Sequence, residues 1–224
     1  MPRMLLFRGS PRSNIIEVER YNPVLPCDKL IIRFVTEFKA YEQARDFFLQ
    51  HEEYDYLVLA TDDIIVRPEH IIQLQKDLEE FQFAVISGVM NVDQSDYSKP
   101  EGFLNICYEL ALKDRKLRSY SWIKRKDLPK EDKFLVKFSG FPLMAIRRDI
   151  VQMTPFAADG LYKGKDMHFG ASLDFVFCWF CHEHGIPIYA DKRIDMYHLR
   201  TSGRMQLGEK EKRTEFIPFN TNSS

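Results

Sequence analysis

The chain has 224 residues, of which 45% are hydrophobic and 13% aromatic, so it can bury the core of one sizeable folded domain. Its 32 lysines and arginines nearly balance 33 aspartates and glutamates, a balance that does not favour nucleic acid or an anionic membrane as a partner. No apolar run has the length of a transmembrane helix, no signal peptide is recognisable, and four cysteines do not make a disulfide scaffold. We therefore expect a reduced, cytoplasmic protein with no transmembrane segment and no nucleic-acid partner.

The first ninety residues alternate between strand-like and helix-like patterns. Apolar runs predict buried strands, and two stretches between them have apolar residues at helical spacing. The strands are predicted at 3–7, 29–36, 56–60 and 83–90, and the helices around 41–48 and 68–78. This alternation predicts an α/β fold, with a central, mainly parallel mixed sheet flanked by helices.

The loop after the first strand contains Arg8, Gly9 and Ser10. A Gly-Ser turn with neighbouring arginines can receive a phosphate group or a nucleotide. A plain solvated loop is the alternative, and these residues favour it slightly over a binding loop.

The third strand ends at two adjacent carboxylates, Asp62 and Asp63, before Pro68 opens a helix. Open α/β sheets bind ligands beyond the carboxyl ends of their strands. Two neighbouring carboxylates repel each other, so a divalent cation at this turn would relieve an electrostatic cost. The alternative is an ordinary acidic turn in which an aspartate caps the helix.

The middle of the chain is less regular. Phe103, Ile106, Cys107 and Leu110 fit one face of a helix, and the basic stretch 113–137 that follows contains Trp122. Aromatic side chains among positive charges can bind a sugar or an anionic substrate, and a solvated loop is the alternative. A strand at 134–138, a turn with Gly140 and Phe141, and a short helix at 147–153 are predicted next.

The last third contains an aromatic helix that begins near Asp174 and ends at Gly185. Cys178 and Cys181 lie within this helix, and we interpret them as core-facing thiols rather than as a metal or redox pair. Two short strands at 186–190 and 194–197 lead to His198. Without repeats or linkers, the chain is predicted to form a single domain at 1–205, followed by a partly flexible tail at 206–224.

Asp62-Asp63 after the third strand, Asp174 at a helix start and His198 after a late strand resemble, in this order, the GT-A nucleotide-sugar glycosyltransferases. The family 2-like, inverting group is the most similar. The resemblance runs from the first strand to His198. It implies a GT-A, Rossmann-like fold, a nucleoside-diphosphate sugar donor, a glycan or other hydroxyl acceptor, and Mn²⁺ or Mg²⁺ as cofactor. The implied activity is that of a glycosyltransferase of the hexosyltransferase type.

The resemblance also assigns roles to single residues. The family holds its metal with an Asp-x-Asp motif, which here reads Thr61-Asp62-Asp63, so Asp63 becomes the metal ligand and Asp62 binds the ribose or sugar or reaches the metal through water. His198 matches a late histidine that ligates the metal in many GT-A enzymes. Asp174 matches the catalytic base, although Leu173 stands where the family has glutamate.

Further residues are assigned to the acceptor side and to donor contacts. The acceptor side is expected at Trp122, Gly140 and Phe141. Contacts to the donor are expected from residues in the first loop, the acidic turn and the segment after His198, namely Arg8, Gly9, Ser10, Thr61, Arg200 and Arg204. The first loop lacks the Pro-Thr-Tyr-Asn-like sequence of the family, so the nucleobase is not assigned.

Three other functions were weighed against the sequence. A sugar-phosphate nucleotidyltransferase would carry a longer glycine-rich, basic signature than Arg8-Gly9-Ser10-Pro11. A non-catalytic module that binds a nucleotide sugar or carbohydrate would bind without turnover. A metal phosphohydrolase needs more ligands than one histidine and one acidic turn provide.

Overall fold

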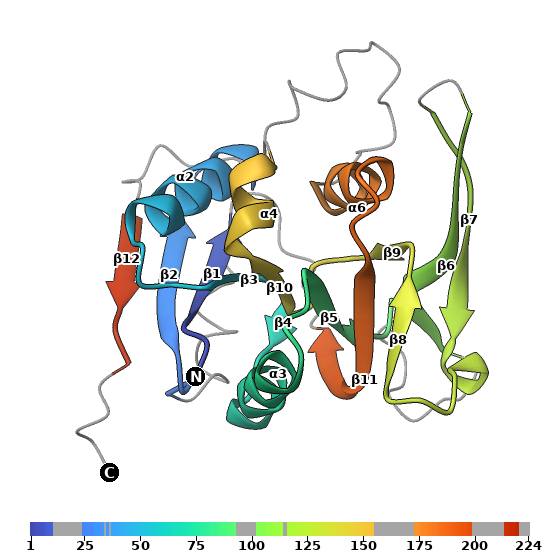
Figure 1. Cartoon of the computed structure of the whole chain (residues 1–224), viewed down its shortest axis with the longest axis horizontal. Helices are drawn as coiled ribbons and strands as arrows, with labels where there is room; N and C mark the ends of the chain where they lie inside the picture. The colour runs from blue at the N-terminus through green and yellow to red at the C-terminus, as the bar shows by residue number, and fades with distance from the viewer. Residues whose placement is uncertain are drawn as a thin grey trace.

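The computed structural model describes residues 1–10, 24–33, 35, 37–92, 102–113, 116–154, 173–198 and 213–219. Its strands and helices are mixed along the chain, and several strands follow one another directly in the middle (Figure 1). In order they are β1 (Met4–Ser10), β2 (Asp28–Arg33), α2 (Glu37–Gln50), β3 (Tyr56–Ala60), β4 (Ile64–Ile65), α3 (Pro68–Glu80), β5 (Val85–Met90), β6 (Phe103–Lys113), β7 (Lys116–Lys124), the 3-10 helix η1 (Arg125–Asp127), β8 (Lys133–Val136), β9 (Phe138–Ser139), β10 (Met144–Arg147), α4 (Arg148–Met153), α6 (Leu173–Glu183), β11 (Ile188–His198) and β12 (Arg213–Ile217).

The large sheet is mixed. Its strand order is β12-β2-β1-β3-β10-β5-β11-β4, and β8 also pairs with β11. β1 pairs in parallel with β2 and β3, and β5 pairs in parallel with β11. β10 runs antiparallel between β3 and β5 and joins these two parallel groups. The predicted α/β class, with a mixed sheet flanked by helices in a Rossmann-like arrangement, is confirmed.

Helices cover both faces of this sheet. Along β1, Leu5 and Phe7 enter one apolar cluster, whereas Met4 and Leu6 enter the other, as the period of two in a strand requires. The first cluster packs under α2, α4 and α6, and the second packs against α3 (Figure 1). The strands therefore read as continuous apolar runs because both of their faces are buried.

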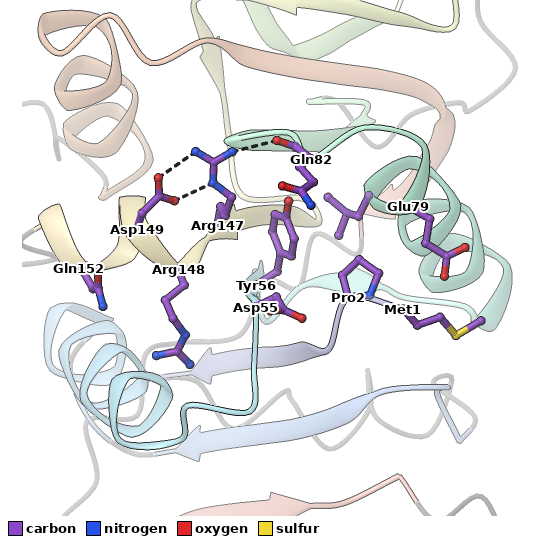
Figure 2. A pocket seen from close by; sticks show the side chains of 11 residues that line it. Met1, Pro2, Asp55, Tyr56, Glu79, Gln82, Arg147, Arg148, Asp149 and Gln152 are labelled. Carbon is purple, nitrogen blue, oxygen red and sulfur yellow. Dashed lines mark hydrogen bonds and ion pairs between the residues drawn. The ribbon is translucent and has the colours of Figure 1, made fainter.

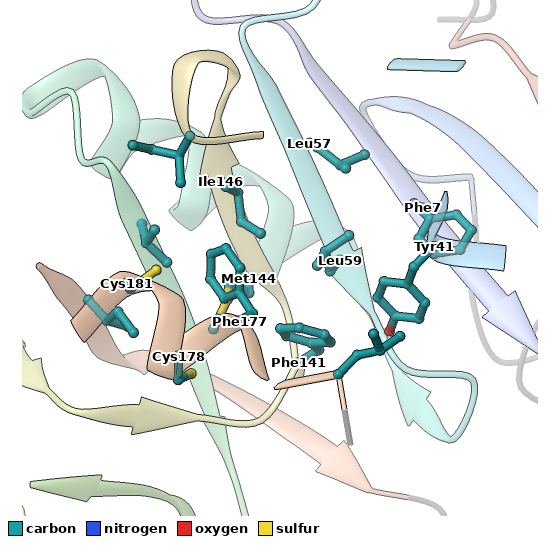
Figure 3. Packing of buried hydrophobic residues seen from close by; sticks show 14 of the residues in the cluster. Phe7, Tyr41, Leu57, Leu59, Phe141, Met144, Ile146, Phe177, Cys178 and Cys181 are labelled. Carbon is teal, nitrogen blue, oxygen red and sulfur yellow. The ribbon is translucent and has the colours of Figure 1, made fainter. Parts of the chain in front are cut away.

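Aromatic rings support one end of the sheet. The Tyr41 ring of α2 lies 5.0 Å from the Phe7 ring and 5.5 Å from the Phe141 ring, measured between centroids. Phe141 in turn lies 6.0 Å from Phe177 of α6 (Figure 3). This row of rings fixes the loop that contains Phe141 between two helices. Cys178 and Cys181 are buried in the same cluster, so their interpretation as core thiols is confirmed.

The helix predicted around 103–110 is wrong, because these residues form β6. This strand belongs to a second sheet, with the order β7-β6-β9, and pairs with β7 in an antiparallel hairpin. The register of that pairing shifts between Phe103 and Cys107 and again between Cys107 and Leu110. A bulge changes which face the following side chains point to, so irregular pairing produced an apolar spacing that imitates a helix. Part of the presumed basic loop is the partner strand β7.

Two further differences concern the end of the chain. The strands predicted at 186–190 and 194–197 are one strand, β11, with a shift in its register to β5 between Ala190 and Asp195. β12, which lies in the segment assigned to the tail, pairs antiparallel with β2 at the edge of the large sheet. No helix within the described ranges has both the length and the apolar character that crossing a membrane requires.

Gly88 of β5 faces the irregular part of β11. A Cβ at position 88 would lie 2.6 Å from the backbone oxygen of Ile194 and 2.7 Å from its Cγ2. We expect Gly88→Ala to lower the free energy of unfolding by about 1–3 kcal/mol, because the two strands must separate to admit the methyl group. Urea denaturation measures the change.

Gly185→Ala is the matched control for this substitution. A Cβ at Gly185 meets no atom within 4 Å, but its φ of +65° disfavours alanine. This variant is expected to lose about 1 kcal/mol from backbone conformation alone. If Gly88→Ala loses no more unfolding free energy than Gly185→Ala, β11 can shift away from position 88 at little cost.

Candidate functional site

The acidic turn and the late histidine come together at the end of the large sheet. Asp62 and Asp63 follow β3, and β4 begins directly after them. β4 pairs antiparallel with the end of β11, which places His198 opposite Ile64. His198 Nε2 lies 3.1 Å from Asp63 Oδ2, although the two residues are 135 positions apart in the chain. The structure thus brings the two predicted metal ligands together, Asp63 from the turn before β4 and His198 from the end of β11.

The next contact joins the acidic turn to the predicted acceptor side. The backbone N–H of Thr61 donates to the carbonyl oxygen of Phe141, with the two atoms 3.1 Å apart. The Thr61 hydroxyl oxygen is closed to solvent and has no hydrogen-bond partner within the described part of the chain. Asp62, the next residue, is also buried. The acidic turn is therefore packed beside the Gly140-Phe141 loop, with polar groups of Thr61 and Asp62 buried.

Asp174 lies at the other side of that loop, in the first turn of α6. Its Oδ1 accepts the backbone N–H of Phe175 at 2.8 Å. Its Oδ2 lies 3.5 Å from the point where a Cβ of Gly140 would be. The amino-terminal end of a helix favours the ionised carboxylate. The predicted base and the predicted acceptor loop are therefore neighbours.

The loop predicted at Arg8, Gly9 and Ser10 is wrong, because these residues extend β1 through its parallel pairing with β2. Arg8 is only 1% exposed, and its Nη2 donates to the backbone oxygen of Ile64, so the guanidinium supports the chain just after the acidic turn. A Cβ on Gly9 would lie 2.9 Å from the Cβ of Ala40, so glycine lets α2 pack closely on β1. Ser10 is the last residue of β1. Contacts from these three residues to a donor stay predictions.

Of the remaining predicted site residues, the structure describes Trp122. The Trp122 ring lies 5.5 Å from the Phe138 ring, which stacks on Phe175 at 4.2 Å. Because Phe175 follows Asp174, a row of rings connects Trp122 to the start of α6. Arg200 and Arg204 lie outside the described residues.

Asn105 of β6 is a site residue that the sequence did not reveal. Its side-chain oxygen accepts the backbone N–H of Met90 at 2.8 Å, and its backbone oxygen accepts the N–H of Gly140 at 3.0 Å. The side chain is buried, and its Nδ2 has no hydrogen-bond partner in the described ranges. Nδ2 lies 3.3 Å from the Cβ position of Gly140. The only sequence signal was a lone amide in an apolar run.

Asp63 and His198 provide the donor types that Mn²⁺ or Mg²⁺ accepts, a carboxylate oxygen and an imidazole nitrogen. No group of three His, Cys, Asp or Glu side chains among the described residues is arranged to hold a metal ion. Within the described residues, this pair therefore supplies two ligands at most.

Buried charges hold the two elements that carry this pair. Asp77 of α3 and Asp191 of β11 are both fully buried, and Arg193 Nη2 lies 2.8 Å from Asp77 Oδ1 and 2.6 Å from Asp191 Oδ2. Lys133 Nζ lies 3.4 Å from Asp77 Oδ1. Burial, together with the neighbouring Asp191, raises the pKa of Asp77 to about 7. This cluster ties the helix after the acidic turn to the strand that ends at His198.

A cavity of about 670 Å³ lies at the opposite end of β3 (Figure 2). Its lining includes Asp55 and Tyr56 at the start of that strand, whereas the acidic turn follows its last residue. The guanidinium of Arg147 is bound by Asp149 and by the carbonyl oxygen of Gln82. Arg148 donates to three backbone oxygens, those of Tyr54, Phe48 and His51. Because structural partners already engage both arginines, the cavity shows no anion site.

No protein-family model and no curated protein sequence matches the chain. Among solved structures, the chain is similar to the A197 protein from STIV, at 20% identity, with 89% of this chain and 86% of that chain covered and a TM-score of 0.49. It is also similar to CMP:2-keto-3-deoxy-manno-octonic acid synthetase complexed with CTP (12% identity, 85% and 89% covered, TM-score 0.44). A third similar structure is the inositol-1-phosphate CTP transferase from T. maritima (10% identity, 90% of each chain covered, TM-score 0.44). The fold class rests on the strand order and the site on its own contacts, and neither depends on these likenesses.

Proposed function

We propose that the protein is a metal-dependent, inverting glycosyltransferase of the GT-A, family 2-like type, which moves a sugar from a nucleoside-diphosphate sugar to an acceptor hydroxyl. One observation carries the proposal. The Asp63–His198 pair and the Asp174 carboxylate, taken from three distant parts of the chain, meet the same loop region through Thr61 and Gly140. Such a pair and a separate carboxylate beside one loop would provide ligands for a metal and a base for the acceptor.

Asp174 is the proposed general base. In the reaction, an oxygen lone pair of the acceptor hydroxyl forms the bond to the anomeric carbon, and the hydroxyl proton moves to the Asp174 carboxylate. The bond from the anomeric carbon to the diphosphate oxygen breaks, and its electron pair leaves with the nucleoside diphosphate. Aspartate is a weak base in water, so its usefulness depends on its placement.

Asp63 and His198 would hold the divalent cation, Mn²⁺ or Mg²⁺. When bound, such a cation supplies Lewis-acid stabilisation of the negative charge on the departing diphosphate. Thr61 and Asp62 would bind the donor beside it, since both residues lie in the same turn as Asp63.

The test is a thermal-shift panel of UDP-, GDP- and CMP-linked sugars, each with Mn²⁺, with Mg²⁺ or with EDTA. We expect one donor to raise the Tm by roughly 5–10 °C at a hundredfold excess over its Kd, and only with metal present. This gain should disappear in Asp63→Ala, because the carboxylate that holds the cation is missing.

The matched control is Asp55→Ala, which removes a carboxylate from the opposite end of β3. This variant loses the hydrogen bond from the backbone N–H of Arg3, so its own Tm falls slightly, yet its response to donor and metal should equal that of the parent. Shifts of equal size in Asp63→Ala, or shifts that persist in EDTA, would contradict the metal-dependent function. Donor binding with no transfer to any acceptor would identify a binding module instead.

A further inference from the structure

Two carboxyl groups meet in the interior of the protein, one from α3 and one from β11. Asp77 and Asp191 are both 0% exposed. Their side chains lie within hydrogen-bond reach of each other. An ionised carboxylate has only acceptor oxygens, so two of them cannot form a hydrogen bond. The contact therefore requires one proton between the two residues.

The surroundings of Asp77 indicate where this proton lies. Three donors reach its Oδ1: Arg193 Nη2 at 2.8 Å, Gln73 Nε2 at 3.1 Å and Lys133 Nζ at 3.4 Å. The other oxygen, Oδ2, is closed to solvent, and no donor in the described part of the chain reaches it. A proton on Oδ2 would turn this atom into a donor, and the neighbouring carboxylate of Asp191 would accept its hydrogen bond.

Asp191 is the partner that stays ionised, because Arg193 binds both of its oxygens. The backbone N–H and Nε of Arg193 donate to Asp191 Oδ1 at 2.8 and 3.0 Å, and Nη2 donates to Oδ2 at 2.6 Å. Burial raises the pKa of Asp191, but these hydrogen bonds outweigh burial and leave that pKa below its ordinary value. Burial, followed by the contact with Asp191, raises the pKa of Asp77 to about 7. The proton is therefore held by Asp77.

The other charges around the pair leave a negative charge to be neutralised. Lys133 of β8, which approaches Asp77, also lies 2.5 Å from Glu80 of α3. Arg193 and Lys192 of β11 each lie 3.7 Å from Asp132, in the loop before β8. With the buried pair, four carboxyl groups thus share three cations among the described residues. One bound proton balances the cluster.

We propose that Asp77 and Asp191 form a pH-sensitive latch between α3 and β11, closed by one shared proton. When the proton leaves, two buried negative charges face each other, and their repulsion opposes the packing of the helix on the strand. α3 follows the acidic turn and β11 ends at His198, so the latch controls how firmly these two parts of the site are held together. The latch does not depend on which reaction the site catalyses.

Asp77→Asn tests the latch, because asparagine has the shape of a protonated aspartate and does not ionise. Its amide oxygen can accept the donors at Oδ1, and its amide N–H can donate to Asp191. We expect the variant to match the stability of the parent at about pH 5 and to exceed it at about pH 8.

The direction follows from the pKa of Asp77, which is about 7 in the folded protein and 3.8 in the unfolded chain. The stabilisation by this proton is therefore complete at low pH and is lost as the pH rises through about 7. The unfolding constant of the parent, divided by that of the variant, should rise roughly tenfold per pH unit from about pH 5 and level off above about pH 7. Urea denaturation at several pH values measures this ratio.

An ordinary ion-pair partner would give the opposite result. If Asp77 were ionised throughout, Asp77→Asn would remove an attraction to Arg193 and Lys133 and would be less stable than the parent by the same factor at both pH values, which would overturn the inference. Asp149→Asn is the control. The hydrogen bond from Arg147 lowers the pKa of Asp149, so its ratio of unfolding constants should not change between about pH 5 and about pH 8.

Two further measurements do not rely on the stability of the variant alone. In the parent, the ¹³C resonance of the Asp77 carboxyl should titrate near pH 7, and an Asp77 that is already ionised at about pH 5 would overturn the inference. At about pH 8, backbone amides of α3 should exchange hydrogen about tenfold faster in the parent than in Asp77→Asn. Equal exchange rates in the two proteins would show that the proton does not hold α3 on β11.

Discussion

Replacing Asp174 by asparagine is expected to lower the rate of sugar transfer by roughly two to four orders of magnitude, the usual contribution of a general base. The fold should tolerate the change. Asparagine is as good as aspartate at a helix amino terminus, and its side-chain oxygen can still accept the N–H of Phe175. Donor binding should also persist, because the carboxylate acts on the acceptor. The experiment compares initial transfer rates, the Tm and the donor-induced thermal shift of both proteins.

Asp149→Asn is the matched control for this loss. Asp149 is also an aspartate in the first turn of a helix, α4, but it pairs with Arg147 beside the cavity at the opposite end of β3. Transfer by this variant should stay within about twofold of the parent rate, since an exposed ion pair contributes little. An Asp174→Asn protein that binds donor and transfers at the parent rate would show that a different group removes the proton.

Arg193→Met is expected to lower the free energy of unfolding by about 3 kcal/mol near neutral pH, the lower end of the range for breaking a buried ion pair. The variant leaves Asp77 and Asp191 fully buried without their shared guanidinium. The lower end applies because the Arg193 side chain is itself 37% exposed. Lys133, which lies 3.4 Å from Asp77 Oδ1, compensates in part. Urea denaturation of both proteins at several pH values measures the penalty.

The loss of stability caused by Arg193→Met should increase as the pH rises. Burial, the neighbouring Asp191 and the opposing charges of Arg193 and Lys133 place the pKa of Asp77 at about 7, above its unfolded value of 3.8. Between these two values the folded protein holds a proton that the unfolded chain releases, so this group favours folding less as the pH rises. Loss of Arg193 removes a charge that lowers this pKa. The destabilisation should therefore be larger at about pH 8 than at about pH 5, where the carboxyl is protonated and needs no cation.

Arg67→Met serves as the control for this substitution. The Arg67–Glu69 pair lies on the surface, with side chains 58% and 64% exposed and a separation of 3.8 Å. Its loss should change stability by less than about 1 kcal/mol at either pH. A penalty in Arg193→Met that is equal at low and high pH would mean that Asp77 does not titrate in the folded protein. Because the cluster joins α3 to β11, the variant should also weaken the metal-dependent response to donor.

Part of the fold could be predicted because local patterns were sufficient. The sequence pattern predicted strands at β1, β3 and β5, since both of their faces are buried and each contains a run of apolar side chains. Helix α6 ends at Glu183, and Gly185 with its positive φ follows in the turn after it, close to where the sequence indicated. The position of Asp62 and Asp63 also followed from the sequence, because a buried strand ends where charged residues begin. These features depend on neighbours only a few residues away.

Other features depended on contacts with a second segment of the chain. β6 was mistaken for a helix because bulges in its pairing with β7 set the apolar spacing. Arg8 was expected in a solvated or ligand-binding loop, but the approach of Ile64 buries its guanidinium. Neither effect leaves a local signature, since each arises from a partner strand more than a few residues away.

The amino-acid sequence alone determined the class of the fold and the chemical types available to the site: a pair of carboxylates after a strand, an aspartate at a helix start and a late histidine. The tertiary structure alone decided which of these groups meet. His198 reaches Asp63 only because β4 pairs with the end of β11, and Asn105 lies beside Gly140 only because the backbone of β6 hydrogen-bonds to that loop. Contacts of this kind are set by strand register across the chain, which local spacing does not encode.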